Sequence, residues 1–346
     1  DGEETGLHGA AAFAREHPWA KEVAVVLNFE ARGVFGPSLM FETGAGNLDV
    51  VRMLQRVPGT RATSISTAVY RRLPNDTDLS EMSVLGQPAM NFAFIGGVER
   101  YHTAEDDPDH LAPGTLQHHG EQALALARAF GNEDLPRPAT PDAVFFFAPV
   151  IGAVAYAESW AMPLAALALA LALAAFVMRC RTDESWGWSL WAGIRMAGFA
   201  LLVAPVVGFV VGGRLVWLHS QQVLGSGTPR WSSVYGFAVA AISVAIVLLS
   251  YALARRRAGP AAWPAALLLW AIVSLVVARL MPGASFLITW PVLAAAIAEA
   301  LSAWRPRSLT IARVGPAAAT VVAVVLVAPT AYLMVCVALG LDAIGA

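Results

Sequence analysis

The chain has 346 residues, of which 57% are hydrophobic and only 14% charged, whereas soluble globular proteins are typically about 45–50% apolar and about 25% charged. Its net charge of −2 hides two unlike parts: residues 1–142 carry 20 acidic and 11 basic residues, and residues 143–346 carry 5 and 12. This composition excludes a single soluble domain, a disordered chain, and a nucleic-acid-binding protein that relies on a general basic field.

The first, acidic part alternates helix-like and strand-like segments. Helical patterns are predicted at 5–16, 47–55, 64–73 and 115–130. Short apolar runs, typical of buried strands, occupy 23–29, 38–41 and 90–95. This alternation predicts an α/β layer architecture for a domain spanning residues 1–135. Both cysteines, Cys180 and Cys336, lie outside this domain, so it has neither a disulfide framework nor a cysteine metal site.

Residues 136–160 are predicted to form a Pro-rich linker and an interfacial segment. Pro136, Pro138 and Pro141 favour a stiff connection. The following run, Val144–Tyr156, is apolar but too short to cross a bilayer in a helix. We expect it to be interfacial or partly buried; if it were a separate span, the orientation inferred below would be reversed.

Residues 161–346 are predicted to form an all-α transmembrane domain with about six helices. Each run has about 17–25 apolar residues, the length that crosses a hydrocarbon core. The predicted spans are 162–178, 190–212, 234–254, 261–280, 285–303 and 314–339.

The distribution of arginines predicts the orientation of these spans. Arginine clusters follow the first, third and fifth spans, at 179–181, 255–257 and 305–313. By the positive-inside rule these loops are cytoplasmic, which leaves the acidic domain outside. Arginine in place of lysine, together with abundant alanine, suggests a bacterial source and hence a multi-pass protein of the bacterial inner membrane.

Two charged residues fall inside or close to the predicted spans. Arg195 lies near the start of its span, and Glu299 lies near Arg305 and Arg307. Intramembrane charges suggest function by default, but snorkelling and local pairing are the simpler interpretation here. The spans also lack the paired, Gly/Pro-broken pattern of a transporter site.

Three short stretches of the acidic domain carry residues suited to metal chemistry. Glu3 and Glu4 precede the first helix, Glu30 lies at the exit of a strand, and Tyr101-His102 follows another strand. Loops that leave strand ends meet at the functional crevice of an α/β sheet. Oxygen and nitrogen ligands without cysteine suit a catalytic zinc rather than a structural one.

Each of these residues also has a structural explanation. Adjacent glutamates at a helix start oppose the helix dipole, and a lone Glu30 or His102 is often a solvated or hydrogen-bonded loop residue. The remaining histidines with no metal-like context are interpreted as structural or surface residues: His8, His17, His118 and His119.

Several stretches in this order resemble the C-terminal half of a family 28 metallopeptidase: DGEETGLHGA, NFEARGVFGPSLMFETGAGN, PNDTDLSEM and YHTAEDDPDHLAPGTLQHHGEQALALARAF. The family comprises zinc aminopeptidases with two co-catalytic metals and an αβα sandwich fold. The chain is most similar to the membrane-anchored subgroup of vacuolar membrane protease and endoplasmic-reticulum metallopeptidase types, in which a peptidase domain precedes a multi-span domain. The resemblance covers residues 1–133 and extends loosely to Gly283-Ala284-Ser285 and Trp290-Pro291.

The resemblance implies a role for each site residue. Glu3 matches the general base and Tyr101 a donor to the developing oxyanion. Glu4 matches a ligand of one zinc, Glu30 the carboxylate on the other zinc, and His102 the last histidine ligand. Asp106 is a candidate for orienting the loop of His102.

The family also needs an upstream histidine and a metal-bridging aspartate, for which the chain shows no motif. We therefore expect an N-terminally truncated fragment that is inactive alone, from a membrane-anchored zinc aminopeptidase acting on peptides. The alternatives are a metal-assisted glutaminyl cyclase-type enzyme and a catalytically silent receptor or scaffold on the peptidase fold.

Overall fold

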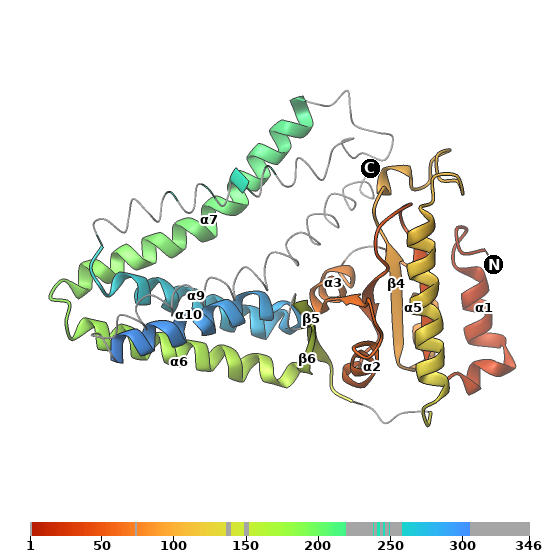
Figure 1. The fold of residues 1–346 in the computed structure, drawn as a ribbon, viewed down its shortest axis with the longest axis horizontal. Coiled ribbons are helices and arrows are strands. Elements are labelled where there is room, and N and C mark those ends of the chain that lie inside the picture. The colour runs from red at the N-terminus through yellow and green to blue at the C-terminus, as the bar shows by residue number, and fades with distance from the viewer. Residues whose placement is uncertain are drawn as a thin grey trace. The chain divides into compact units, whose positions relative to one another are not determined.

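A computed structural model of the chain, drawn in Figure 1, describes residues 2–72, 75–135, 140–148, 152–218 and 258–304, with isolated positions between 238 and 249. The chain divides into two units, Asp1–Ser159 and Trp160–Ala346. The predicted α/β class of the first unit, followed by a helical region, is confirmed.

The first unit contains a mixed four-stranded sheet. Its strands are β1 (Val26–Ala31), β2 (Leu39–Thr43), β3 (Arg61–Ala62) and β4 (Ala89–Phe94), in the order β1-β4-β2-β3. Strand β4 runs parallel to β1 and antiparallel to β2, and β3 runs parallel to β2. The carboxyl ends of β1 and β4 therefore meet at one edge, and the loops that follow them begin side by side.

Five helices accompany the sheet: α1 (His8–Glu16), α2 (Leu48–Leu54), α3 (Ser64–Tyr70), α4 (Asp78–Met82) and α5 (Pro113–Gly131). The first begins three residues later than predicted because Gly6 and Leu7 have φ angles of 121° and 59°, outside the helical region. Helix α4 was not predicted, since five residues are too few to show a helical period.

The core of this unit lies between the sheet and helices α2 and α5. In Figure 1, α5 runs alongside the sheet. Met90, Phe92 and Leu126 are at most 1% exposed and join one cluster with the apolar face of α2. Phe29 of β1 stacks on Phe92 of β4 with ring centroids 4.7 Å apart. Burial of each such side chain stabilises the folded unit by about 1.5–3 kcal/mol. The loops that follow β1 and β4 are therefore attached to a rigid sheet.

The segment predicted to be interfacial or partly buried forms a β-hairpin, which is partly buried in the first unit. Strands β5 (Ala143–Ala148) and β6 (Gly152–Ala157) pair antiparallel. Ala143 and Phe145 join the core of the first unit, and Ser64 Oγ bonds both backbone polar groups of Phe145 at 3.0 Å. The run Val144–Phe147 is rich in residues that favour strands, which explains the difference from the expected interfacial stretch.

The second unit contains helices α6 (Ala161–Cys180), α7 (Trp186–Leu218), α9 (Ala262–Leu280) and α10 (Phe286–Trp304). Among the described residues, α6 with the turn before it, α9 and α10 are long and apolar enough to cross a membrane, judged by length and composition. The predicted span 314–339 lies outside the described residues, and 234–254 contains only isolated described positions.

Helices α6, α9 and α10 pack closely through small side chains, and they lie side by side in Figure 1. Ala172, Ala271 and Ala296 are each 0% exposed at this contact. Ser274 and Thr289 hydrogen-bond across α9 and α10 at 2.7 Å. Small residues and interhelical hydroxyls are typical of helix packing in membranes, where burial of apolar surface gives little gain.

Arg195 and Glu299 each have a local partner, in line with the simpler interpretation of these two charges. Arg179 pairs with Glu299 at 2.7 Å, and Arg195 lies 4.9 Å above the Trp188 ring. The expected partners of Glu299, Arg305 and Arg307, lie outside the described residues. The Arg179–Glu299 pair brings the C-terminal ends of α6 and α10 together, so these two helices run parallel.

Candidate functional site

The loops that follow β1 and β4 are held against each other by close backbone contact. The N–H groups of Val34 and Phe35 both donate to Gly96 O, and Gly96 N–H donates to Phe35 O. A Cβ added at Gly33 would lie 2.3 Å from Gly96 O, so only glycine fits this crossing. The contact fixes the end of β1 at Glu30, with the loop of Arg32, beside the loop of Tyr101 and His102.

Glu4 and His102 form the closest pair among the predicted site residues. Glu4 Oε2 lies 3.0 Å from His102 Nε2, and the two side chains are 68% and 56% exposed. His102 has a φ angle of 57°, a left-handed conformation that is uncommon for a residue with a side chain. Its N–H donates to the Asp106 carboxylate at 3.3 Å. Asp106 thus holds the loop in the way predicted, and the unusual backbone turns the imidazole toward Glu4.

Tyr101 belongs to a stack on the same loop. Its ring lies 3.9 Å from the His102 ring at an interplanar angle of 20°, and the Arg32 guanidinium carbon lies 5.1 Å from the Tyr101 centroid. Burial raises the pKa of the Tyr101 phenol above its ordinary value, while the nearby Arg32 charge opposes that rise. The phenol therefore stays protonated and able to donate at neutral pH.

Glu30 ends a polar network that crosses the face of the sheet. Asn28 Nδ2 donates to Glu30 Oε1 at 2.8 Å and to Asn91 Oδ1 at 3.1 Å. Asn91 Nδ2 in turn donates to Glu42 Oε2 at 3.1 Å and to Thr77 Oγ1 at 2.8 Å. Burial raises the pKa of Glu30, and the hydrogen bond from Asn28 opposes this rise. The network holds one oxygen of the Glu30 carboxylate in a set direction.

Glu3 lies in the turn that precedes α1, where its carbonyl accepts the N–H groups of Gly6 and Leu7. Burial raises the pKa of its carboxyl, and the charges of Glu4, Glu30 and Asp78 raise it further, against His102. The charges that act on Glu3 thus come from all three predicted stretches, and the Glu4–His102 contact joins two of these stretches directly. A carboxyl in such an acidic region is typical of functional sites.

The donor types suit zinc, but the described residues supply an incomplete set of ligands. A carboxylate and an imidazole at 3.0 Å are the oxygen and nitrogen donors expected on one zinc. Glu30 is a further oxygen donor whose charge acts on Glu3. No group of three His, Cys, Asp or Glu side chains within the described ranges is close enough to hold one metal ion. The residues present therefore match zinc by donor type, without forming a complete site among the described residues.

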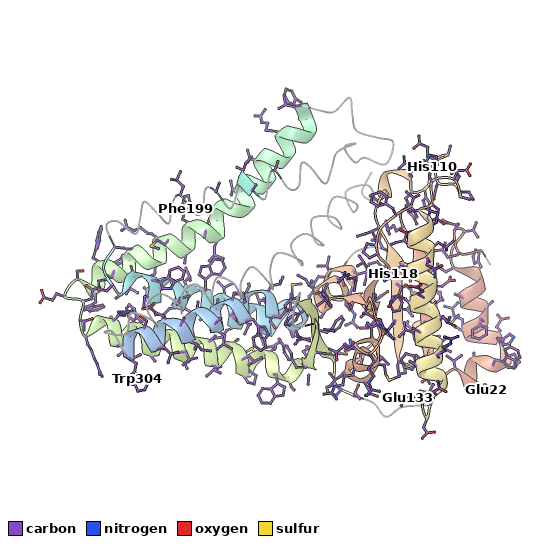
Figure 2. The ribbon with its side chains drawn as sticks, in the orientation of Figure 1. Glu22, His110, His118, Glu133, Phe199 and Trp304 are labelled. Atoms are coloured by element: carbon purple, nitrogen blue, oxygen red, sulfur yellow. The ribbon has the colours of Figure 1, made fainter. Side chains whose placement is uncertain are left out.

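Two histidines of α5 have the structural role that we expected. His118, labelled in Figure 2, accepts the Ser38 N–H through Nδ1 at 3.0 Å and contacts Gly59 O at 3.2 Å. His119 Nδ1 lies 2.8 Å from Ser38 Oγ, with its ring edge-on to Phe29 and Phe94. Both rings join α5 to the start of β2 rather than serving the site.

The sequence analysis missed the residues that support the site. Asn91 is 0% exposed and sits within an apolar strand, where a buried amide needs partners. That exception to the apolar pattern was a usable signal. Thr77 gave no such signal, because its bond to Asn91 joins residues 14 positions apart that lie in different elements.

Comparison with known proteins indicates which family this unit resembles. Residues 1–127 match the model of peptidase family M28. Over these residues the first unit is similar to peptidase family M28. Its similarity to membrane-type relatives is distant: the Homo sapiens endoplasmic reticulum metallopeptidase 1 is 30% identical over 137 residues, covering 38% of this chain and 15% of that protein.

Two further relatives show the same pattern. The Candida albicans vacuolar membrane protease is 31% identical over 157 residues, which cover 44% of this chain and 18% of that protein. The Caenorhabditis elegans putative endoplasmic reticulum metallopeptidase 1-A is 29% identical over 145 residues, which cover 40% and 16%. The chain thus spans less than a fifth of the length of these M28 relatives. No solved structure matches it.

Proposed function

We propose that the protein containing this chain is a membrane-anchored zinc aminopeptidase that removes N-terminal residues from peptides. The observation that carries the proposal is the contact between Glu4 and His102 beside Glu3, on an M28 domain. Because the chain spans a small part of its relatives, the activity is proposed for the full-length protein.

Each of the five site residues has its own proposed role in peptide hydrolysis. We assign Glu4 and His102 to one zinc and Glu30 to the other. When bound, paired zinc ions supply Lewis-acid activation of the attacking water and of the scissile carbonyl. Glu3 takes the proton of that water and delivers it to the leaving amine. The Tyr101 phenol donates a hydrogen bond where negative charge develops on the carbonyl oxygen.

The helical unit would anchor this chemistry at a bilayer. The three candidate spans and the membrane-type relatives support a membrane location. The arginine-rich ends of the predicted spans support an extracytoplasmic peptidase domain. A bacterial inner membrane stays a prediction; the relatives described above come from a nematode, a mammal and a yeast.

Purified full-length protein tests the proposal with three reporter substrates. We expect hydrolysis of an aminoacyl reporter, loss of activity with a chelator, and recovery with zinc. The same reporter with an acetylated amino group should not be cleaved, because an aminopeptidase needs the free amine. A cyclised product from an N-terminal glutaminyl peptide would instead support the glutaminyl cyclase alternative, and no turnover of any substrate would contradict both activities.

A further inference from the structure

Three buried polar atoms near Glu30 have no hydrogen-bond partner among the described residues. They are Arg32 Nε, Tyr70 Oη and Asp78 Oδ1. Folded proteins leave few buried polar atoms unpaired, and a cluster of them needs an explanation such as water, an ion or a ligand. The loop after β1 and the described residues of the segment 70–78 supply these atoms.

These two segments border the same end of the polar network. Arg32 is two residues beyond Glu30, and its N–H donates to Phe94 O at 3.1 Å. Thr77 accepts a hydrogen bond from Asn91, whose own oxygen is bonded to Asn28 beside Glu30. Charge interactions link Tyr70 to Arg32 and to Glu30, and they link Asp78 to Glu30. Arg32, Tyr70 and Asp78 therefore lie within charge-interaction range of one another or of Glu30.

Arg32 carries a positive charge in an acidic region, but it pairs with none of the described carboxylates. Its side chain makes no ion pair or hydrogen bond within the described part of the chain, and its guanidinium carbon lies over the Tyr101 ring. Contact with an aromatic ring leaves the planar donors of a guanidinium available. A guanidinium fork matches a carboxylate in two hydrogen bonds, which a neutral carbonyl cannot equal.

We propose that Arg32, with the Tyr70 hydroxyl beside it, binds a carboxylate of the peptide substrate. This inference rests on the proposed peptidase function and adds a specificity to it. The carboxylate has two possible sources, an acidic side chain of the residue after the scissile bond or the C-terminus of a dipeptide. Both present the same planar anion to Arg32.

The test compares substrates that differ only in that charge. One arm uses dipeptide amides with Glu or Gln in the second position, and the other uses dipeptides with free or amidated C-termini. In one of the two arms we expect kcat/KM to be about tenfold or more higher for the substrate with the carboxylate than for its amide. A charge-assisted hydrogen bond contributes about that factor, and the difference should lie mainly in KM. Arg32→Gln should bring this ratio close to one, and Tyr70→Phe should lower it less. Arg56→Gln, which removes an exposed charge on another loop, should leave it unchanged.

A binding measurement separates this inference from the proposed function. Calorimetric titration of the full-length protein with glutamate and with glutamine amide, which has no carboxylate, requires no turnover, so it works even if no peptide is cleaved. We expect glutamate to bind about tenfold more tightly or better, Arg32→Gln to abolish the difference, and Arg32→Lys to retain part of it. A parent protein without preference for the carboxylate, or an Arg32→Gln variant of unchanged melting temperature that keeps the preference, would overturn the proposal.

Discussion

The side-chain amide of Asn28 donates to the carboxylate of Glu30, two residues farther along the same strand, at 2.8 Å. Side chains at i and i+2 lie on one face of a strand, and the same Asn28 amide also reaches Asn91 on β4. Side chains of the sheet thus orient the Glu30 carboxylate, and the sheet is more rigid than the exposed loop that follows β1.

Loss of this orientation should weaken the metal site. We expect Asn28→Ala to lower zinc affinity and kcat/KM of the full-length protein by about 10–100-fold, the range found for partners of metal ligands. Asn132→Ala is the matched control, because Asn132 bonds only the exposed end of α5 through Arg128 O. Equal zinc affinity in Asn28→Ala and the parent, measured by competition with a chromogenic chelator, would show that Glu30 needs no such support.

The other end of the network predicts a pH-dependent stability. Burial raises the pKa of Glu42 above its ordinary 4.5, with Asn91 and Arg71 opposing the rise. The folded state therefore holds this proton more tightly than the unfolded state. It follows that stability falls as the pH rises above 4.5 toward the folded-state pKa. Glu42→Gln keeps an acceptor for the Asn91 side chain and removes the loss of stability that ionisation of Glu42 causes.

We expect Glu42→Gln to melt at a higher temperature than the parent at pH 7, with the difference shrinking toward pH 4.5. Thermal unfolding followed by tryptophan fluorescence in detergent gives both values. Glu22→Gln, at an exposed position after α1, should show no such trend. A variant that melts lower than the parent at pH 7 would mean that the Glu42 charge stabilises the fold.

Asp183 is predicted to be the main polar support of the helical unit. It is 5% exposed and accepts hydrogen bonds from Ser185 N–H and Oγ, from Ser189 Oγ, and from Ala261 N–H, so that it caps the starts of α7 and α9 together. Burial alone would raise its pKa, but these hydrogen bonds hold the pKa below 3.8. Its contribution is therefore present above pH 3.8 and lost as the pH falls through the folded-state pKa.

Asp183→Ala should destabilise the protein by about 1.5–3 kcal/mol, the range for hydrogen bonds to a charged group, and Asp183→Asn by less. The neighbouring Glu184→Ala is the control, since Glu184 is exposed. Thermal unfolding in detergent compares the three variants. Similar melting temperatures for Asp183→Ala and Glu184→Ala would rule out the double cap.

The bond between Asp183 and Ala261 also predicts membrane topology. It places the loops before α7 and α9 on one side, while the turn Pro282–Ala284 between α9 and α10 lies on the other. With Cys180 and Cys336 replaced by serine, Glu184→Cys and Ala258→Cys should react with an impermeant thiol reagent only from the cytoplasmic side. Met281→Cys should react only from outside. Labelling of Glu184→Cys and Ala258→Cys from opposite sides would contradict this packing.

Much of the fold followed from local pattern, and the differences have physical causes. The apolar runs around Phe29 and Phe92 predicted β1 and β4, because buried strands need continuous apolar residues. The hairpin at 143–157 was not predicted, because a short apolar run is equally typical of a buried strand and of a stretch at a membrane interface. The Arg179–Glu299 pair joins residues 120 positions apart, which no local pattern indicates.

The site followed partly from sequence for a similar reason. Glu4, Glu30 and His102 sit at ends of elements, where the resemblance and the strand order place them together. Their support by Asn28, Asn91 and Thr77 depends on which strands become neighbours, and β4 lies between β1 and β2 against chain order. The left-handed backbone at His102 depends on its surroundings as well, since histidine rarely adopts it unaided.

The central claim is that Glu3 is the general base of a zinc aminopeptidase, and one comparison tests it most directly. Kinetics of aminoacyl reporter hydrolysis by zinc-loaded full-length protein should show kcat reduced by about 10²–10⁴-fold in Glu3→Gln, the usual contribution of a general base. Zinc content should be unchanged, and the exposed Glu16→Gln control should retain full activity. Undiminished kcat in a zinc-loaded Glu3→Gln protein would contradict the account.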